Sequence, residues 1–151
     1  EILLENKNYK LIIIEDKKFR YEIINNTVYA YSKFDPTKTK KEIYKRHIKK
    51  MYLKIDKDID EVLKQNNIYK RKIIFKYYKS KFGSYHRFKD EISINIFLAR
   101  LNINYLYYVL MHEYAHTKEF NHSKSFYNEL SKLMPNYKHY DKSLKKIAIY
   151  D

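Results

Sequence analysis

The 151-residue sequence contains no cysteine, no tryptophan, one glycine and two prolines. Without cysteine the protein can form no disulfide, no cysteine-ligated zinc site and no thiol nucleophile. Its apolar runs are strand-sized, far short of the roughly 18 residues that a membrane-spanning helix needs, so we expect no contact with a membrane. The N-terminus lacks the basic and then apolar segments of an export signal, which makes the cytoplasm the default expectation.

Positive charge, by contrast, is abundant. The chain has 32 lysines and arginines against 18 acidic residues, for a formal net charge of +14. Such an excess is typical of proteins that contact a polyanion, such as a nucleotide or a nucleic acid. The lysines are spread along the chain rather than gathered into one block, which favours a solvated surface instead. The oligomeric state is not predicted by any of these features.

The first third of the chain is rich in strand signals. Residues 9–15 are β-branched, and residues 19–24 alternate between apolar and polar side chains. Asn25 and Asn26 predict a two-residue turn into a third strand at residues 27–31, because asparagine tolerates positive φ. We expect these strands to form an antiparallel β-meander.

A long amphipathic helix is expected next. Thr39 and Glu42 form a capping-box pattern, just after a turn at Asp35 and Pro36. Apolar residues then recur at helical spacing to about Gln65. We expect this helix to pack across a sheet.

The second half of the chain predicts two strands and then helices. The strands cover residues 72–78 and 91–97, with the chain's only glycine, Gly83, between them. The expected helices run from Asn102 or Asn104 to about Phe120, from Ser123 to Leu133 ahead of Pro135, and onward from a cap at Asp141. The order βββ-α-ββ-α-α-α predicts an α+β fold with an antiparallel or mixed sheet. No linker is visible, so we expect one domain over residues 1–151, with the meander and long helix in 1–71 and the chemistry in 72–151.

Residues 112–116 have the sequence H-E-Y-A-H and fall on an expected helix. Residues four apart on a helix lie one above the other, so His112 and His116 can bind the same metal ion. Glu113 is rotated by about 100° around the helix axis and can reach a water beside the ion instead of ligating it. The pattern is typical of zinc-dependent hydrolases and predicts Glu113 as the catalytic base.

A third histidine, His122, can join this site only if the helix ends. On a continuous helix it would lie about 9 Å along the axis from His116 and on a different side. Asparagine is the best residue after glycine for a left-handed helix cap, and Asn121 directly precedes His122. We therefore expect a positive φ at Asn121, or another break in the helix, and a new helix capped by Ser123.

Several motifs carry a resemblance that covers residues 72–145. They are K-F-G-S-Y at 81–85, a strand at 92–96, H-E-Y-A-H at 112–116, N-H-S-K-S-F at 121–126 and P-N at 135–136. With them the sequence resembles the YgjP-like metallopeptidase domain, a small zincin related to SprT- and WLM-type proteins.

This resemblance implies a zincin-like fold and a zinc ion held by His112, His116 and His122, with Glu113 as catalytic base. It also implies that peptides or proteins are substrates. The family's R-W-G-S-C is K-F-G-S-Y here, so three of its five side chains differ.

Three functions remain open after this comparison of motifs. The first is a zinc metallopeptidase, to which the strand at residues 92–96 could offer an edge for an extended peptide. The second is a metal-dependent nucleoside triphosphate hydrolase, and the third is a nucleic-acid-binding module with a structural zinc. Tyr137, His139 and Tyr140 are candidates for stabilising an oxyanion.

Two further histidines, His47 and His86, are expected to be ordinary surface or loop residues.

Overall fold

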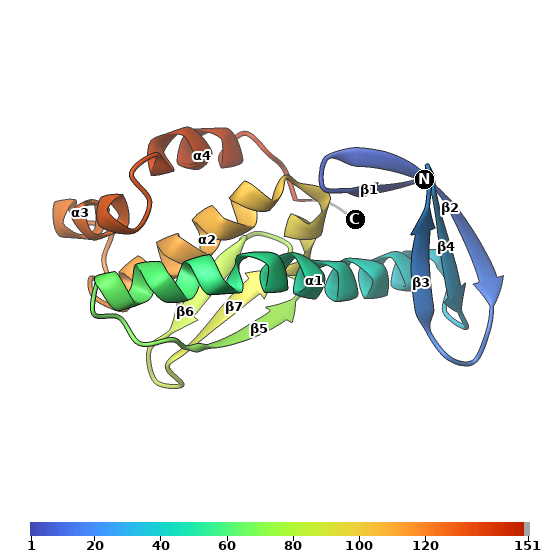
Figure 1. Ribbon diagram of the computed structural model, residues 1–151, viewed down its shortest axis with the longest axis horizontal. Coiled ribbons are helices and arrows are strands. Elements are labelled where there is room, and N and C mark those ends of the chain that lie inside the picture. Colours follow the sequence, from blue (N-terminus) through green and yellow to red (C-terminus); the bar gives the residue numbers. More distant parts are fainter. Residues whose placement is uncertain (150–151) are drawn as a thin grey trace.

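The computed structural model describes residues 1–149, which form two sheets connected by one long helix (Figure 1). The strands are β1 (Ile2–Leu4), β2 (Lys7–Glu15), β3 (Arg20–Ile24), β4 (Thr27–Ser32), β5 (Lys72–Lys76), β6 (Gly83–His86) and β7 (Glu91–Asn95). The helices are α1 (Pro36–Gln65), the 3-10 helix η1 (Ile96–Arg100), α2 (Ile103–His116), α3 (Lys124–Leu133) and α4 (Tyr137–Leu144). These elements confirm the expected α+β class, while residue 151, the expected end of the domain, lies outside the described residues.

The N-terminal sheet has the strand order β1-β2-β4-β3, so the predicted meander is wrong. Strand β2 pairs in parallel with β4, and β4 pairs antiparallel with β3. The turn at Asn25 is confirmed, since Asn25 has a φ of 53° and Ile24 pairs with Thr27. Alternation of side chains identifies a strand but not its neighbour, and here β4 inserts between two strands that are consecutive in the chain.

Helix α1 begins four residues earlier than its capping-box pattern predicts. Asp35 is the N-cap, because its carboxylate accepts a hydrogen bond from the amide of Lys38 at 2.8 Å, and Pro36 follows in the first turn. Thr39, the predicted cap, is instead fully buried inside the helix. Its hydroxyl forms a hydrogen bond of 2.8 Å with that of Ser32 in the adjoining sheet.

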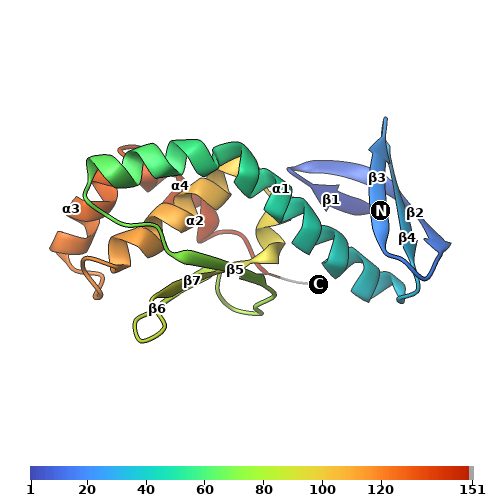
Figure 2. The same ribbon diagram turned by 60° about the horizontal axis from the view of Figure 1, so that its bottom comes forward.

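Hydrophobic side chains form two clusters, and α1 contributes to both. The ribbon shows α1 running from the N-terminal sheet to the second sheet and its helices (Figure 2). The smaller cluster lies between the N-terminal sheet and the start of α1, where Ile43 is fully buried. The larger one includes Ile48 and Met51 of α1 and the buried faces of β7, α2 and α3. The long helix thus packs against both parts of the chain, and its burial on the two cores stabilises it far beyond its intrinsic propensity.

The second sheet has the order β5-β7-β6. Strand β7 is central, parallel to β5 and antiparallel to β6. The expectation that residues 92–96 offer a free edge is therefore wrong, since both edges of β7 are paired. Strand β6, which contains Gly83 and was not expected, forms the edge alongside α2.

The C-terminal helices follow the prediction in part. Ser123 caps α3 as expected, accepting a hydrogen bond from the amide of Phe126 at 3.3 Å. Helix α4 begins at Tyr137, so Asp141 is not its cap. The carboxylate of Asp141 accepts a hydrogen bond of 2.7 Å from Tyr108 on α2 instead. Within residues 1–149, no helix combines the length and apolar character that crossing a membrane requires.

Candidate metal centre

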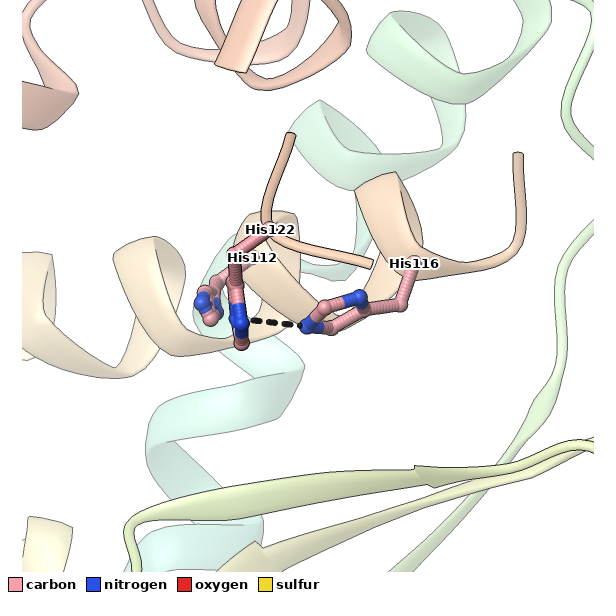
Figure 3. Close-up of side chains that lie close together, drawn as sticks. All are labelled: His112, His116 and His122. Atoms are coloured by element: carbon pink, nitrogen blue, oxygen red, sulfur yellow. Dashed lines mark hydrogen bonds between the residues drawn. The ribbon is translucent and has the colours of Figure 1, made fainter. Parts of the chain in front are cut away.

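Three imidazole rings converge at the end of α2 (Figure 3). His112 and His116 lie one turn apart on this helix, and His122 returns from the loop that leads to α3. One ligand nitrogen from each residue lies within 4.8 Å of the other two. The Nε2 atoms of His116 and His122 are 3.1 Å apart.

This donor set fits a zinc ion. Tetrahedral zinc with Zn–N distances of about 2.0–2.1 Å places its ligand nitrogens roughly 3.3–3.4 Å from one another. The separation of 3.1 Å between His116 and His122 is close to that value, and the limit of 4.8 Å leaves a small adjustment for His112. Three histidine ligands leave a fourth position open, as in catalytic zinc sites.

The chain reverses before His122 without a left-handed residue. Helix α2 ends at His116, and the amides of Lys118 and Glu119 both donate to the carbonyl of Ala115, at 3.1 and 3.0 Å. Asn121 does not have a positive φ, so the prediction of a left-handed cap there is wrong. The alternative, that the helix breaks in another way, is confirmed, because a tight turn directly after His116 satisfies the last carbonyls of the helix.

That turn also orients one of the three histidines. The Nδ1 atom of His116 lies 3.3 Å from the carbonyl oxygen of Glu119, which accepts a hydrogen bond from it. The Nε2 atom of His116 then keeps its lone pair for a metal ion. A backbone acceptor has no signature in the sequence, so this contact was not predicted.

Phe126 packs against all three histidines. Its ring centroid lies 5.0 Å from that of His112, 4.4 Å from that of His116 and 4.9 Å from that of His122. The ring is fully buried in the first turn of α3. Phe126 therefore restricts the rotamers of the three imidazoles, and the Ser123 cap fixes the helix that carries it.

Glu113 lies on the flank of the same site. Its carboxylate is buried, with a residue exposure of 6%, and one oxygen lies 3.8 Å from Nδ1 of His112. Burial raises the pKa of Glu113 to about 8, opposed by the positive charge of Lys81. Burial likewise lowers the pKa of His112 to about 3, assisted by the neighbouring His116 and His122. The protein thus keeps His112 neutral, as a ligand must be.

Gly83 allows β6 to approach α2 closely at this point. A Cβ atom on Gly83 would lie 2.7 Å from Cγ1 of Val109 and 3.2 Å from Oε2 of Glu113. The φ of Gly83 is not positive, so the glycine is required for space rather than for an unusual backbone conformation. This explains why the single glycine of the chain faces the candidate base.

Two cavities meet at Gly83, His112 and Glu113. The first is a cleft of about 410 Å³ between the edge of β6 and the α2–α3 loop, and it contains all three histidines. The second, of about 250 Å³, is lined mainly by apolar side chains. Its further lining residues are Phe82, Tyr108, Val109, Asp141, Leu144 and Lys145.

The side chains suggested for an oxyanion lie elsewhere. None of Tyr137, His139 and Tyr140 lines either cavity. Tyr137 is buried against Tyr127, with ring centroids 5.9 Å apart, and His139 packs on Tyr140 at 4.9 Å. They share the C-terminal part of the chain with the site but do not face it.

The two remaining histidines differ from each other. The prediction that His47 lies at the surface is wrong, because this residue of α1 is buried. Its two ring nitrogens lie 2.9 Å from a carboxylate oxygen of Glu5 and 3.1 Å from the hydroxyl of Tyr21. His86 is half-buried and ends strand β6. Neither belongs to the metal centre.

Comparison with known proteins gives a family and a similar solved fold. None of the curated proteins searched matches the sequence. Among solved structures, the fold is similar to that of the metallopeptidase zymogen jannalysin of Methanocaldococcus jannaschii, with a TM-score of 0.51 and 23% sequence identity. That match covers 61% of this chain and 94% of jannalysin and confirms the zincin-like fold. Residues 1–147 match the sequence model of the YgjP-like metallopeptidase domain, and the chain belongs to this family.

Proposed function

We propose that the protein is a zinc-dependent metallopeptidase in which His112, His116 and His122 hold the ion and Glu113 is the general base. The observation that supports this most directly is the common cleft. Three imidazole nitrogens lie within 4.8 Å of one another, and the Glu113 carboxylate borders the same space, 3.8 Å from His112.

Bound by these histidines, zinc supplies a Lewis acid that polarises the peptide carbonyl and lowers the pKa of water toward about 7. Glu113 removes a proton from the attacking water as the new carbon–oxygen bond forms. The same carboxyl group then delivers that proton to the peptide nitrogen as the carbon–nitrogen bond breaks. Burial beside Val109 and Gly83 keeps its carboxylate oriented and protected from bulk water.

Strand β6 is the segment best placed to align a peptide. It is an edge strand, paired only on the β7 side, and Gly83, Ser84 and Tyr85 line the cleft. An extended peptide that adds to this edge by main-chain hydrogen bonds would pass directly in front of the three histidines. Strand β6 thus takes the role that the sequence suggested for residues 92–96.

The composition of the cleft favours a peptide over a nucleoside triphosphate. Its lining residues include no lysine or arginine, although enzymes that hydrolyse triphosphates stabilise the phosphates with cationic groups. A purely structural zinc is also less suitable here, because structural sites are closed by four protein ligands and this one has three.

The test is the pair Glu113→Gln and Glu119→Gln. Glu119 lies close in sequence, but only its backbone carbonyl contacts a ligand, so its amide variant is a matched control. Wild type and both variants should contain one zinc per chain by elemental analysis. Against a peptide library read by mass spectrometry, Glu113→Gln should lose roughly 10²–10⁴-fold in kcat, while Glu119→Gln should not. Turnover of nucleotides but not peptides would reject the proposal, and so would undiminished peptide cleavage by Glu113→Gln.

A further inference from the structure

The turn that joins β6 to β7 carries Arg87 at one end of the cleft. The guanidinium carbon of Arg87 lies 4.6 Å from the ring centroid of Phe120, in the α2–α3 loop. Phe120 is 49% exposed, and its other side lines the cleft beside His116. Arg87 therefore extends from the end of the edge strand to the loop that carries His122, and the ring of Phe120, which lines the cleft, holds the guanidinium next to it.

Arg87 differs from three other arginines of the protein because its guanidinium has no acidic side chain as a partner. Arg20, Arg46 and Arg71 each form an ion pair with an acidic side chain at 3.0 Å. Within the described part of the chain, the Arg87 guanidinium makes no hydrogen bond or ion pair. Its five N–H donors are thus available in a fixed planar array, which matches the geometry of a carboxylate.

The surrounding charge favours the same kind of ligand. Residues 66–101, which include β5, β6, β7 and their turns, contain nine lysines and arginines and only two acidic residues. One of those two, Asp90, is already bound by Arg71 and Tyr85. The segment that carries Arg87 is therefore basic overall, which favours an acidic side chain over a basic one as its partner.

We propose that Arg87 is a specificity-determining residue that binds a glutamate or aspartate of the substrate. This rests on the proposed peptidase function. A peptide antiparallel to β6 has its N-terminal part at the end of this strand, next to Arg87. Because a strand advances about 3.3 Å per residue, Arg87 lies about two or three residues beyond the part of β6 that faces the histidines. The acidic side chain thus belongs two or three positions before the cleaved bond.

The first experiment measures recognition without cleavage. The zinc-loaded Glu113→Gln variant is titrated with labelled peptides that carry either glutamate or glutamine at each of three positions before the scissile bond, and binding is followed by fluorescence anisotropy. Glutamate should bind about fivefold more tightly than glutamine at one position, and less so as salt is raised. Adding Arg87→Ala should bring this ratio close to one, and Arg87→Glu should shift the preference toward lysine.

Lys89→Ala is the matched control, since Lys89 is an exposed cation in the same turn and should leave the ratio unchanged. Zinc content and the thermal midpoint establish that each variant is folded. Equal binding of the two peptides, or a preference that survives Arg87→Ala, would overturn the role of Arg87. A second measurement compares kcat/KM for the same peptides with wild type. If neither peptide is cleaved, the peptidase function fails, while the anisotropy ratio still decides the role of Arg87.

Discussion

Replacing Gly83 by alanine has two opposite effects on the free energy of unfolding. In a strand whose φ suits any residue, glycine to alanine normally stabilises a protein by about 0.4–1 kcal/mol, because the unfolded chain loses entropy. Here the added Cβ would lie 2.7 Å from Cγ1 of Val109, roughly 1 Å closer than carbon atoms pack favourably. Overpacking of this kind costs about 1–3 kcal/mol, so we expect a net destabilisation of about 1–2 kcal/mol.

The same substitution should reduce turnover. The new Cβ would also contact the carboxylate of Glu113, at 3.2 Å. Either β6 or Glu113 must move, and a displacement of about 1 Å in a catalytic group can cost on the order of 100-fold in rate. Peptide hydrolysis by Gly83→Ala should therefore fall by much more than its loss of stability explains.

A double-mutant cycle with Val109→Ala isolates the contact. Val109→Ala alone should cost about 2 kcal/mol of unfolding free energy, from lost burial and a small cavity. It also removes the Cγ1 atom that obstructs the new methyl group, so the double variant should cost at least about 1 kcal/mol less than the two single costs added. Urea unfolding at one fixed zinc concentration measures all four proteins. A Gly83→Ala protein that is more stable than wild type, with full activity, would refute the close approach of β6 to α2.

Three further predictions concern the metal centre. Phe126→Ala should cost about 3–5 kcal/mol of stability and weaken zinc binding, whereas Phe126→Leu should retain most of both, by urea unfolding and competition with a chelator. Zinc at 100 times its Kd should stabilise wild type by about 2.7 kcal/mol, an increment that His122→Ala should largely lose in thermal denaturation. In the metal-free protein, the low pKa of His112 (about 3, against 6.5) makes stability fall as pH drops through that range. The high pKa of Glu113 (about 8, against 4.5) makes stability fall as pH rises from about 4.5 to about 8. Urea midpoints should therefore be highest between about pH 4.5 and 6.5, and Glu113→Gln should abolish the decline at higher pH.

Local sequence was sufficient to predict that His112, His116 and His122 lie together, but not how the chain brings His122 to the other two. The spacing of His112 and His116 follows from helix geometry alone, and it survives in the fold because α2 is buried along most of its length. The sequence predicts a reversal before His122 but indicates Asn121 for it, which has no positive φ. The turn forms at Lys118 and Glu119 through backbone hydrogen bonds to Ala115, for which the side chains carry no specific signal.

Tertiary pairing was beyond the reach of the pattern. Strand β6 has four residues and contains a glycine, so it has neither the length nor the β-branched content that identifies a strand. It pairs with β7, and the side-chain amide of buried Asn95 donates hydrogen bonds to the Tyr78 and Lys81 carbonyls of the segment that leads into it. Similarly, no pattern in residues 9–32 indicates that β4 lies between β2 and β3 in the sheet. Strand β6 packs on α2 and strand β4 packs on α1, and only the complete fold determines these contacts.

The insertion of β4 between β2 and β3 has a consequence for the order of folding. The β3–β4 hairpin closes through two residues and can form by itself, since its pairing is entirely local. Strand β2 precedes that hairpin but can pair in parallel only with β4, so its registry cannot be set until the hairpin exists. During synthesis, β2 therefore leaves the ribosome with an unpaired apolar segment, Leu11 to Ile14, that must wait for residues 27–32. Slowing the hairpin at Asn25 should thus prolong the exposure of a strand that lies outside it.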